Sequence, residues 1–265
     1  MNMINSGQAA IIKKDFQSVV SNKRLFPVLM IVPLVFTVIL PTVFILIVYF
    51  VPDDMGDFQT LLDLMPLGKQ QDTVARTIIA LIMNNIVPCF FMMIPIMAAS
   101  VTAASSFVGE KEKKTLETLL YCPQPLNRIF QAKVCASFLL SMAVSISSFV
   151  VMLIVVETEV LLVTGSMLLP DISWLVVLLV VSPAISLLAI TLIVGGSAKA
   201  QTIEESQQRA VFLILPILLL ISGQFTGIIL INALYMLGLG AVFAVIAYIL
   251  LKRAARKFTY EALLR

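Results

Sequence analysis

Long apolar stretches separated by short polar segments dominate this sequence. A transmembrane helix needs about 20 predominantly apolar residues, and six stretches meet that length, none of them containing Asp, Glu, Lys or Arg. They cover residues 25–51, 77–105, 134–156, 172–194, 210–230 and 233–251. The pattern predicts an all-α polytopic membrane protein with six transmembrane helices, forming a single transmembrane domain over residues 1–265.

The composition narrows the possible functions. Of 265 residues, 60% are hydrophobic and 12% charged, whereas soluble domains have about 45–50% and about 25%. The chain contains no histidine, which excludes imidazole general bases and His-ligated metal sites. Cys89, Cys122 and Cys135 form no C-x-x-C pair and are expected to be free thiols. We therefore predict no catalytic residue and no metal site.

The distribution of basic residues predicts the orientation. If the N-terminus is cytoplasmic and the spans alternate, sixteen of the eighteen Lys and Arg residues face the cytoplasm, and only Lys69 and Arg76 lie outside. By the positive-inside rule, both termini are cytoplasmic, and residues 252–265 form a basic cytoplasmic tail. The first apolar stretch is too long for a signal-peptide core and is interpreted as a retained span. The predicted location is a cell membrane, bacterial or archaeal.

Two flanking segments have helical periodicity. Ile12, Phe16, Val19 and Val20 lie on one face of residues 9–24, which predicts an amphipathic helix on the membrane surface; a basic flank without that role is the alternative. In the outside loop 52–76, apolar residues at positions 58, 61, 62 and 65 predict a short helix over the outer mouth.

The segment 106–133 is the richest of the predicted cytoplasmic loops. It begins with a charged helical stretch in which Glu110 and Lys114 have i,i+4 spacing. Pro123 and Pro125 then break the helix, and a second helix starts near Leu126 and leads into the third span. Two interpretations remain open: a docking element for a soluble partner, or a solvated loop.

At these residues the chain resembles a known family. The runs 107–112 and 115–120, followed by Pro123, Ile129 and Lys133, are similar to the signature loop of type-2 ABC exporter permeases. The segment 198–208 before an apolar span with Pro216 is similar to the segment before the fifth span of those permeases. The chain departs from the family pattern at Lys114, where glycine is common, and at Ala132, which replaces a glycine before Lys133.

The resemblance implies a permease subunit that pairs with a second permease chain, identical or related, and with a separate ATPase. It implies that residues 110–120 form a coupling element near the membrane and that residues 121–130 touch the ATPase. The ATPase-coupling residues implied in this way are Glu110, Lys111, Glu112, Lys113, Lys114, Thr115, Leu116, Glu117, Leu120, Pro123, Gln124 and Arg128.

The chain offers no nucleotide site of its own. Gly109–Thr115 has the ends of a phosphate-binding loop but lacks its second glycine and a preceding strand. No soluble stretch is long enough for an ATPase domain. ATP and Mg²⁺ are therefore expected on the partner ATPase, no cofactor is expected on this chain, and membrane lipid but no nucleic acid is expected as a further partner.

Small polar side chains form a stripe in the third span. Ser137, Ser141, Ser145 and Ser148 share one face, and Thr102 lies in similar register in the second span. Such stripes allow helices to approach closely, so they indicate helix packing or a lining of the transport path. Gln224 lies in a polar interruption, 222–227, that predicts either a broken or re-entrant helix or a tight hairpin. Prolines within the spans predict kinks, namely Pro33, Pro41, Pro88, Pro95, Pro183 and Pro216.

Three functional hypotheses compete. The favoured hypothesis is a permease of an ATP-driven exporter, forming a dimeric pathway for an amphipathic compound, peptide or drug; sodium or polysaccharide export by the same machinery is an alternative. A secondary transporter or channel would be expected to carry ionisable residues in mid-span, and the spans have none. A regulator or scaffold that does not transport would use the same loop for docking and remains open.

Overall fold

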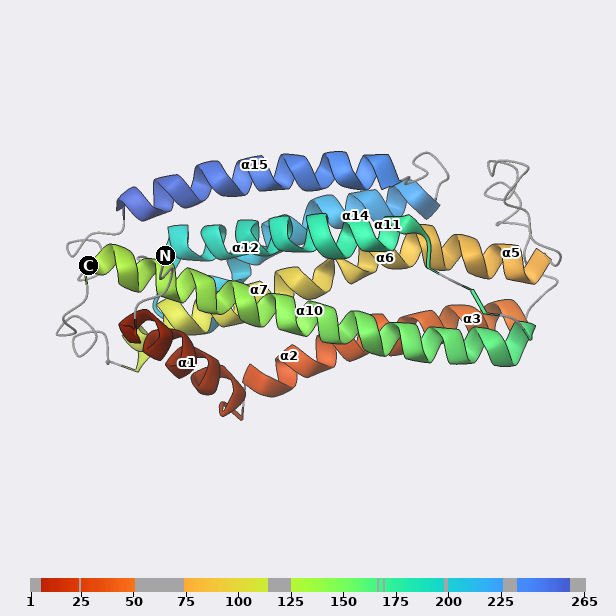
Figure 1. The fold of residues 1–265 in the computed structure, drawn as a ribbon, viewed down its shortest axis with the longest axis horizontal. Coiled ribbons are helices and arrows are strands. Elements are labelled where there is room, and N and C mark those ends of the chain that lie inside the picture. The colour runs from red at the N-terminus through yellow and green to blue at the C-terminus, as the bar shows by residue number, and fades with distance from the viewer. Residues whose placement is uncertain are drawn as a thin grey trace.

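In the computed structural model, the regular secondary structure of the chain is helical. The structure describes residues 6–23, 25–50, 74–113, 125–165, 167–168, 170–197, 200–225 and 233–257, and no strand occurs within these ranges. Figure 1 shows an elongated bundle of roughly parallel helices. The all-α fold class predicted from the sequence is therefore confirmed.

Within the described ranges, six helices are long and apolar enough to cross a membrane, as predicted: Leu25–Phe50, Arg76–Phe107, Leu126–Thr164, Ile172–Ser197, Ile203–Gln224 and Ala233–Arg256. Several are built from consecutive pieces. The first span comprises α2 (Leu25–Leu34), η1 (Val35–Ile39) and α3 (Leu40–Phe50), and the second comprises α5 (Val74–Leu81), η4 (Ile82–Ile86), α6 (Val87–Phe91) and α7 (Met93–Phe107). The third is the single helix α10 (Leu126–Thr164).

The remaining spans follow the same scheme. The fourth comprises α11 (Ile172–Val176), η5 (Val177–Val181) and α12 (Ser182–Ser197). The fifth comprises α13 (Ile203–Gln207), η6 (Gln208–Ala210) and α14 (Val211–Phe225), and the sixth is α15 (Ala233–Lys257). In the described part of the chain, two short elements lie outside the spans, α1 (Ser6–Val20) and α8 (Gly109–Glu112). The predicted outer helix around residues 58–65 lies outside the described residues.

The helices share two ends. At one end, called the α1 end here, Figure 1 shows α1 beside the first turns of α10, near the last turns of α12 and α15. The opposite end carries α3, α5 and the last turns of α10. The described helices thus run up and down through one bundle, in agreement with the alternation predicted from the sequence.

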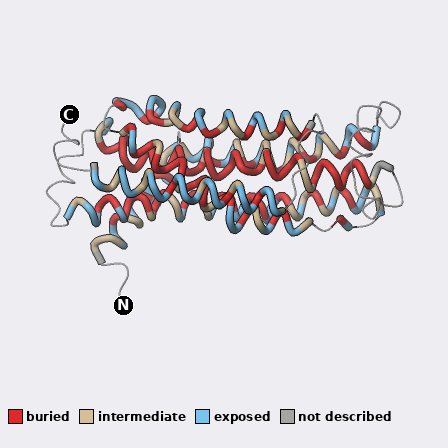
Figure 2. Tube along the Cα trace, turned by 90° about the horizontal axis from the view of Figure 1, so that it is seen from above, coloured by how far each residue is buried: buried red, intermediate tan, exposed pale blue. Residues whose placement is uncertain are grey.

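The second span is the centre of the bundle. Of its most apolar stretch 83% is buried, against 22% for the first span and 17% for the sixth. α7 packs against both α10 and α12, while α15 packs on α12 from outside. In Figure 2 the buried positions concentrate on the inner helices and exposed positions line the outer ones. The outer spans therefore present wide apolar faces to their surroundings.

Three spans are interrupted by a π-helical turn just before a proline. The turns η1, η4 and η5 each end two residues before Pro41, Pro88 and Pro183, respectively. A proline has no N–H to donate to the preceding turn, and local widening to i→i−5 bonding accommodates that loss. The Thr37 hydroxyl donates to the Pro33 carbonyl at 2.7 Å, so side chains also supply donors there. Distortion was predicted at these prolines, and here it takes the form of π-turns.

Helix α10 is longer than the apolar stretch that predicted it. Its 39 residues span about 58 Å at 1.5 Å per residue, well beyond the roughly 30 Å hydrocarbon core of a bilayer. Lys133 and Glu157, the charged residues that flank its apolar stretch, are separated by about 36 Å along the helix. Both ends of α10 therefore extend out of the hydrocarbon region.

Candidate functional site

A cluster of charged side chains, mostly buried, lies at the α1 end, with Lys14 on its exposed side. Glu110 of α8 lies between two lysines: its Oε1 is 2.7 Å from Lys14 Nζ of α1, and its Oε2 is 3.0 Å from Lys133 Nζ of α10. The Glu110 and Lys133 side chains are 10% and 2% exposed. We call Lys14, Asp15, Ser106, Glu110 and Lys133 the charge cluster. It joins α1 and α10 to the consecutive elements α7 and α8.

The buried ammonium group of Lys133 has several interaction partners. Besides its ion pair with Glu110, its Nζ donates a hydrogen bond to the main-chain carbonyl of Ser106. Nζ also lies 5.6 Å from the ring centroid of Phe107, a cation–π distance, and Phe130 packs edge-on against that ring. A buried charge is tolerated only when it is paired and hydrogen-bonded, and Lys133 meets both conditions.

Asp15 completes the cluster from α1. It is 6% exposed, and the Ser106 hydroxyl donates a hydrogen bond to its Oδ2. Burial raises the pKa of Asp15, outweighing the Lys133 charge and the Ser106 hydroxyl, which act to lower it. Burial alone would lower the pKa of Lys14, but the hydrogen bond and charge of Glu110 reverse this effect and the pKa is raised.

The same end is tied to the fifth span. Glu112 Oε2 accepts a hydrogen bond from the backbone N–H of Ile203 at 3.1 Å. That N–H is one of the unsatisfied donors at the start of α13, and the Thr202 hydroxyl caps the helix by accepting from Glu205 N. Through Glu110 and Glu112, α8 therefore holds α1, α10 and α13 together.

Apolar contacts support α1 beneath the charge cluster. Ile11 of α1 is buried against Ile129 and Ala132 of α10, and the Gln8 amide donates to the carbonyl of Arg128 at 3.4 Å. The amphipathic helix predicted from the sequence therefore forms, and in this structure its apolar residues contact α10. Phe16 and Val20 remain exposed on the helix.

The structure describes part of the predicted coupling surface. Glu110 is buried in the charge cluster, whereas Glu112, Lys113 and Arg128 are exposed and Lys111 is half-buried. Lys114, Thr115, Leu116, Glu117, Leu120, Pro123 and Gln124 lie outside the described residues. Glu110 pairs with Lys14 and Lys133, whereas Lys114, the local partner expected for it, lies outside the described residues. No sequence signal indicated the contacts of Lys14 with Glu110 and of Asp15 with Ser106, because these residues lie 96 and 91 positions apart in the chain, respectively.

The polar stripe of α10 is buried between helices. Ser141 Oγ donates to the Pro95 carbonyl of α7 at 3.0 Å and lies 3.0 Å from Ser186 Oγ of α12. Thr102 Oγ1 donates to the Ser137 carbonyl at 3.3 Å. Ser145 and Ser148 are also buried and donate to carbonyls of their own helix. The stripe thus lies at the junction of α7, α10 and α12.

Gln224 occupies a different position, near the end of α14. Its side chain is 2% exposed and lies next to Cys89 of α6. Its amide lies within hydrogen-bonding reach of the Cys89 sulfur, a weak acceptor, and has no stronger partner among the described residues. A buried amide with only a weak partner costs free energy, which makes Gln224 a candidate for a role beyond packing. Residues 222–225 of the predicted polar interruption continue α14 as helix, and its remaining residues, 226 and 227, are not described.

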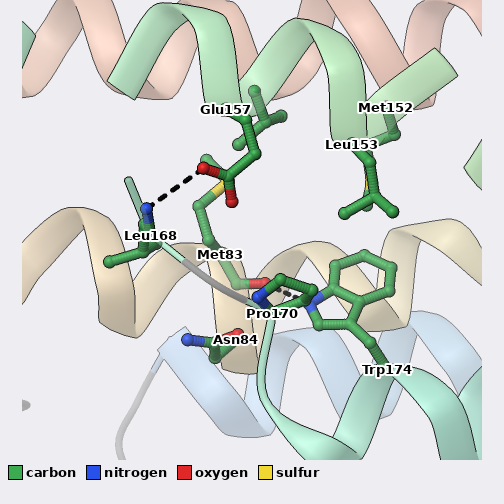
Figure 3. A pocket seen from close by; sticks show the side chains of 9 residues that line it. Met83, Asn84, Met152, Leu153, Glu157, Leu168, Pro170 and Trp174 are labelled. Carbon is green, nitrogen blue, oxygen red and sulfur yellow. Dashed lines mark hydrogen bonds between the residues drawn. The ribbon is translucent and has the colours of Figure 1, made fainter. Parts of the chain in front are cut away.

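A small cavity lies at the opposite end, between α10 and the fourth span (Figure 3). Its volume of about 20 Å³ leaves room for one water molecule. Hydrogen bonds hold its walls together: Glu157 Oε2 accepts from Leu168 N, Trp174 Nε1 donates to the Met83 carbonyl, and each distance is 3.1 Å. The cavity is too small for a transported compound, and its polar contacts fasten the connection between α10 and α11.

Comparison with known proteins gives one match. The sequence model of the family described as ABC-2 family transporter protein matches residues 9–231, from within α1 to just beyond α14. The searches of curated proteins and of solved structures returned no significant match.

Proposed function

Because the chain belongs to the ABC-2 transporter family, a family of multi-pass membrane transport subunits, we propose that it is the permease of an exporter driven by a separate ATPase. The α1 end then faces the cytoplasm, in agreement with the excess of Lys and Arg there. ATP and Mg²⁺ bind to the partner ATPase, and this chain supplies the path across the membrane.

The observation that carries the proposal is the position of Glu110. It pairs with Lys14 and Lys133 at the point where the second span leads into the segment that resembles a coupling loop. A force applied to residues 110–130 by a closing ATPase therefore reaches α1 and α10 together. Without these ion pairs, the segment would be joined to α7 and α10 only through the chain and would lose its ion pair with α1.

Within the membrane, the serine contacts extend this connection. Ser141 links α10 to the carbonyl of Pro95 in α7 and to Ser186 in α12. In the proposed mechanism, α7, α10 and α12 shift as one packed group when the ATPase closes. The resulting motion opens the pathway at the interface with the second permease chain.

The outer faces of the bundle support a pathway built from two chains. The first, fifth and sixth spans expose large apolar side chains, including Phe50, Phe212 and Leu234, and 28% or less of their most apolar stretches is buried. A second permease, identical or related, covers part of these faces in the proposal. The apolar surroundings favour an amphipathic cargo such as a peptide, lipid-like compound or drug over sodium or polysaccharide.

Co-purification tests the proposal. The full chain is isolated in mild detergent from its native membranes, and bound subunits are identified and counted by mass spectrometry. We expect one soluble ATPase per permease chain. Recovery of the chain alone, or with membrane partners that are not ATPases, would favour the regulator or scaffold hypothesis.

A variant pair then tests the role of Glu110. In vesicles containing the complex, Glu110→Gln is expected to lower transport per ATP hydrolysed while the complex stays assembled. Glu204→Gln removes an exposed carboxylate from α13 and is the matched control, expected to transport normally. Equal transport per ATP in both variants would contradict the assignment of coupling to the charge cluster.

A further inference from the structure

A wide groove lies between the first turns of α10 and the last turns of α15, at the α1 end. Its volume is about 610 Å³, far larger than the cavity at the opposite end. Asn127, Phe130 and Gln131 line it from α10, and Tyr248, Lys252 and Arg256 from α15. α15 packs mainly on α12 and η5, which leaves its side toward α10 open.

The lining combines two chemical characters. Phe130, Tyr248 and Leu251 are apolar or aromatic, whereas Lys252 and Arg256 are cations, and none of the described residues that line the groove is acidic. Lys252 and Arg256 are four residues apart on α15, so they are neighbours on one helix face and repel each other. Both are exposed. An anion between them would remove that repulsion.

The depth of the groove indicates where such an anion would come from. Gln131 and Phe130 are within one turn of Lys133, which flanks the apolar stretch of α10 at this end. The cationic residues of α15 likewise follow directly after its apolar stretch, which exposes Val245 and Ile249. The groove therefore lies at the level of the lipid headgroups, with apolar surface leading from it toward the membrane centre.

We propose that this groove binds the headgroup of an anionic phospholipid. The lipid phosphate lies between Lys252 and Arg256, and the amides of Asn127 and Gln131 donate to headgroup oxygens. Tyr248 packs against the glycerol region, and the acyl chains follow the exposed apolar face of α15. Basic pockets between transmembrane helices are a known type of site for anionic headgroups. The proposal does not depend on which compound the protein transports.

Lipid retention in nanodiscs tests the proposal on the full chain. The protein is placed in discs of phosphatidylcholine containing a minor fraction of phosphatidylglycerol, and bound lipid is counted by native mass spectrometry. We expect phosphatidylglycerol to be retained. The double variant Lys252→Gln/Arg256→Gln should bind it about 30-fold more weakly, from the loss of two interfacial cations.

Matched variants separate the groove from net charge. Lys23→Gln/Arg253→Gln removes the same charge at exposed positions outside the groove lining and should retain the lipid. Lys252→Arg/Arg256→Lys keeps both charges and should also retain it. If the double glutamine variant fails to fold, Gln131→Glu adds an acid to the groove and should reject phosphatidylglycerol. If Lys252→Gln/Arg256→Gln and Gln131→Glu retain as much phosphatidylglycerol as the Lys23→Gln/Arg253→Gln control, the proposal is overturned.

Two further outcomes would also overturn it. Inorganic phosphate that displaces phosphatidylglycerol at equal concentration would identify a site for free anions rather than for a lipid. Cross-linking from Gln131→Cys or Tyr248→Cys into a protein partner, in place of lipid, would show that an acidic protein surface fills the groove. Cross-linking to a photoactivatable phosphatidylglycerol, reduced in Lys252→Gln/Arg256→Gln, is the result expected from the proposal.

Discussion

Lys133 and Glu110 form an ion pair across two helices, with 3.0 Å between Nζ and Oε2 and with both side chains almost fully buried. One residue precedes the apolar stretch of the third span and the other follows that of the second. Their pairing brings the two ends of the segment 111–132 close together. The segment that resembles a coupling loop is therefore anchored at both of its ends.

Breaking this pair should destabilise the protein. Lys133→Met takes from the buried Glu110 carboxylate the more deeply buried of its two described lysine partners, and removing one member of a buried pair costs about 3–5 kcal/mol. We expect a clear fall in the temperature at which the detergent-solubilised protein loses its monodisperse elution peak. Lys13→Met, at an exposed position of α1, should leave that temperature nearly unchanged; equal falls would contradict the structural role of Lys133.

Asp15 predicts a pH dependence of stability. Because its pKa is raised by burial, the contribution of its protonated form is fully present below the ordinary value of 3.8 and is lost as the pH rises through the folded-state pKa. The asparagine side chain of Asp15→Asn does not ionise, so this variant does not lose that stability as the pH rises. Between about pH 4 and pH 7, its thermal stability relative to the unmodified protein should therefore rise. Glu204→Gln gives the control pH profile, and parallel profiles for all three proteins would contradict the prediction.

The serine stripe predicts a steric limit at the centre of the bundle. Ser141 is fully buried between Pro95 and Ser186, so Ser141→Leu overpacks the junction of α7, α10 and α12 at a cost of about 1–3 kcal/mol. Ser141→Ala removes only hydrogen bonds, worth about 0.6 kcal/mol each in membranes. Thermal stability should therefore fall far more for leucine than for alanine. Ile146→Leu, at an exposed position of the same helix, should be neutral.

Two adjacent glycines of α12 differ in the space available for a side chain. A Cβ built at Gly196 would overlap the Arg209 guanidinium group, whereas one at Gly195 would meet nothing within 4 Å. Gly195→Ala should raise stability by up to about 1 kcal/mol, since alanine is the better helix former. Gly196→Ala must displace Arg209 from the C-terminal end of α12, where a cation is favoured, and should be less stable than Gly195→Ala. Equal thermal stabilities would contradict the observed contact.

The spans could be predicted from the sequence because each depends on one local property, about 20 apolar residues in a row. The pairing of Glu110 could not, because Lys14 lies 96 residues away in the chain and Lys114 offered a local alternative at i,i+4. Which lysine pairs with Glu110 depends on how α1 packs against α10, and no local spacing encodes that packing. Kinks at the prolines were predictable, but the extra residue per π-turn depends on the tertiary contacts of each span.

The charged residues that bracket α10 also set a preferred bilayer thickness. Lys133 is fixed by its contacts with Glu110 and Ser106, and Glu157 is fixed by Leu168 N, so neither can slide readily along the membrane normal. A bilayer much thinner or thicker than the apolar interval between them would have to deform or force the bundle to tilt, at fractions of a kcal/mol per Å of mismatch. Hydrophobic matching should therefore make the activity of this protein sensitive to acyl-chain length, independently of headgroup chemistry.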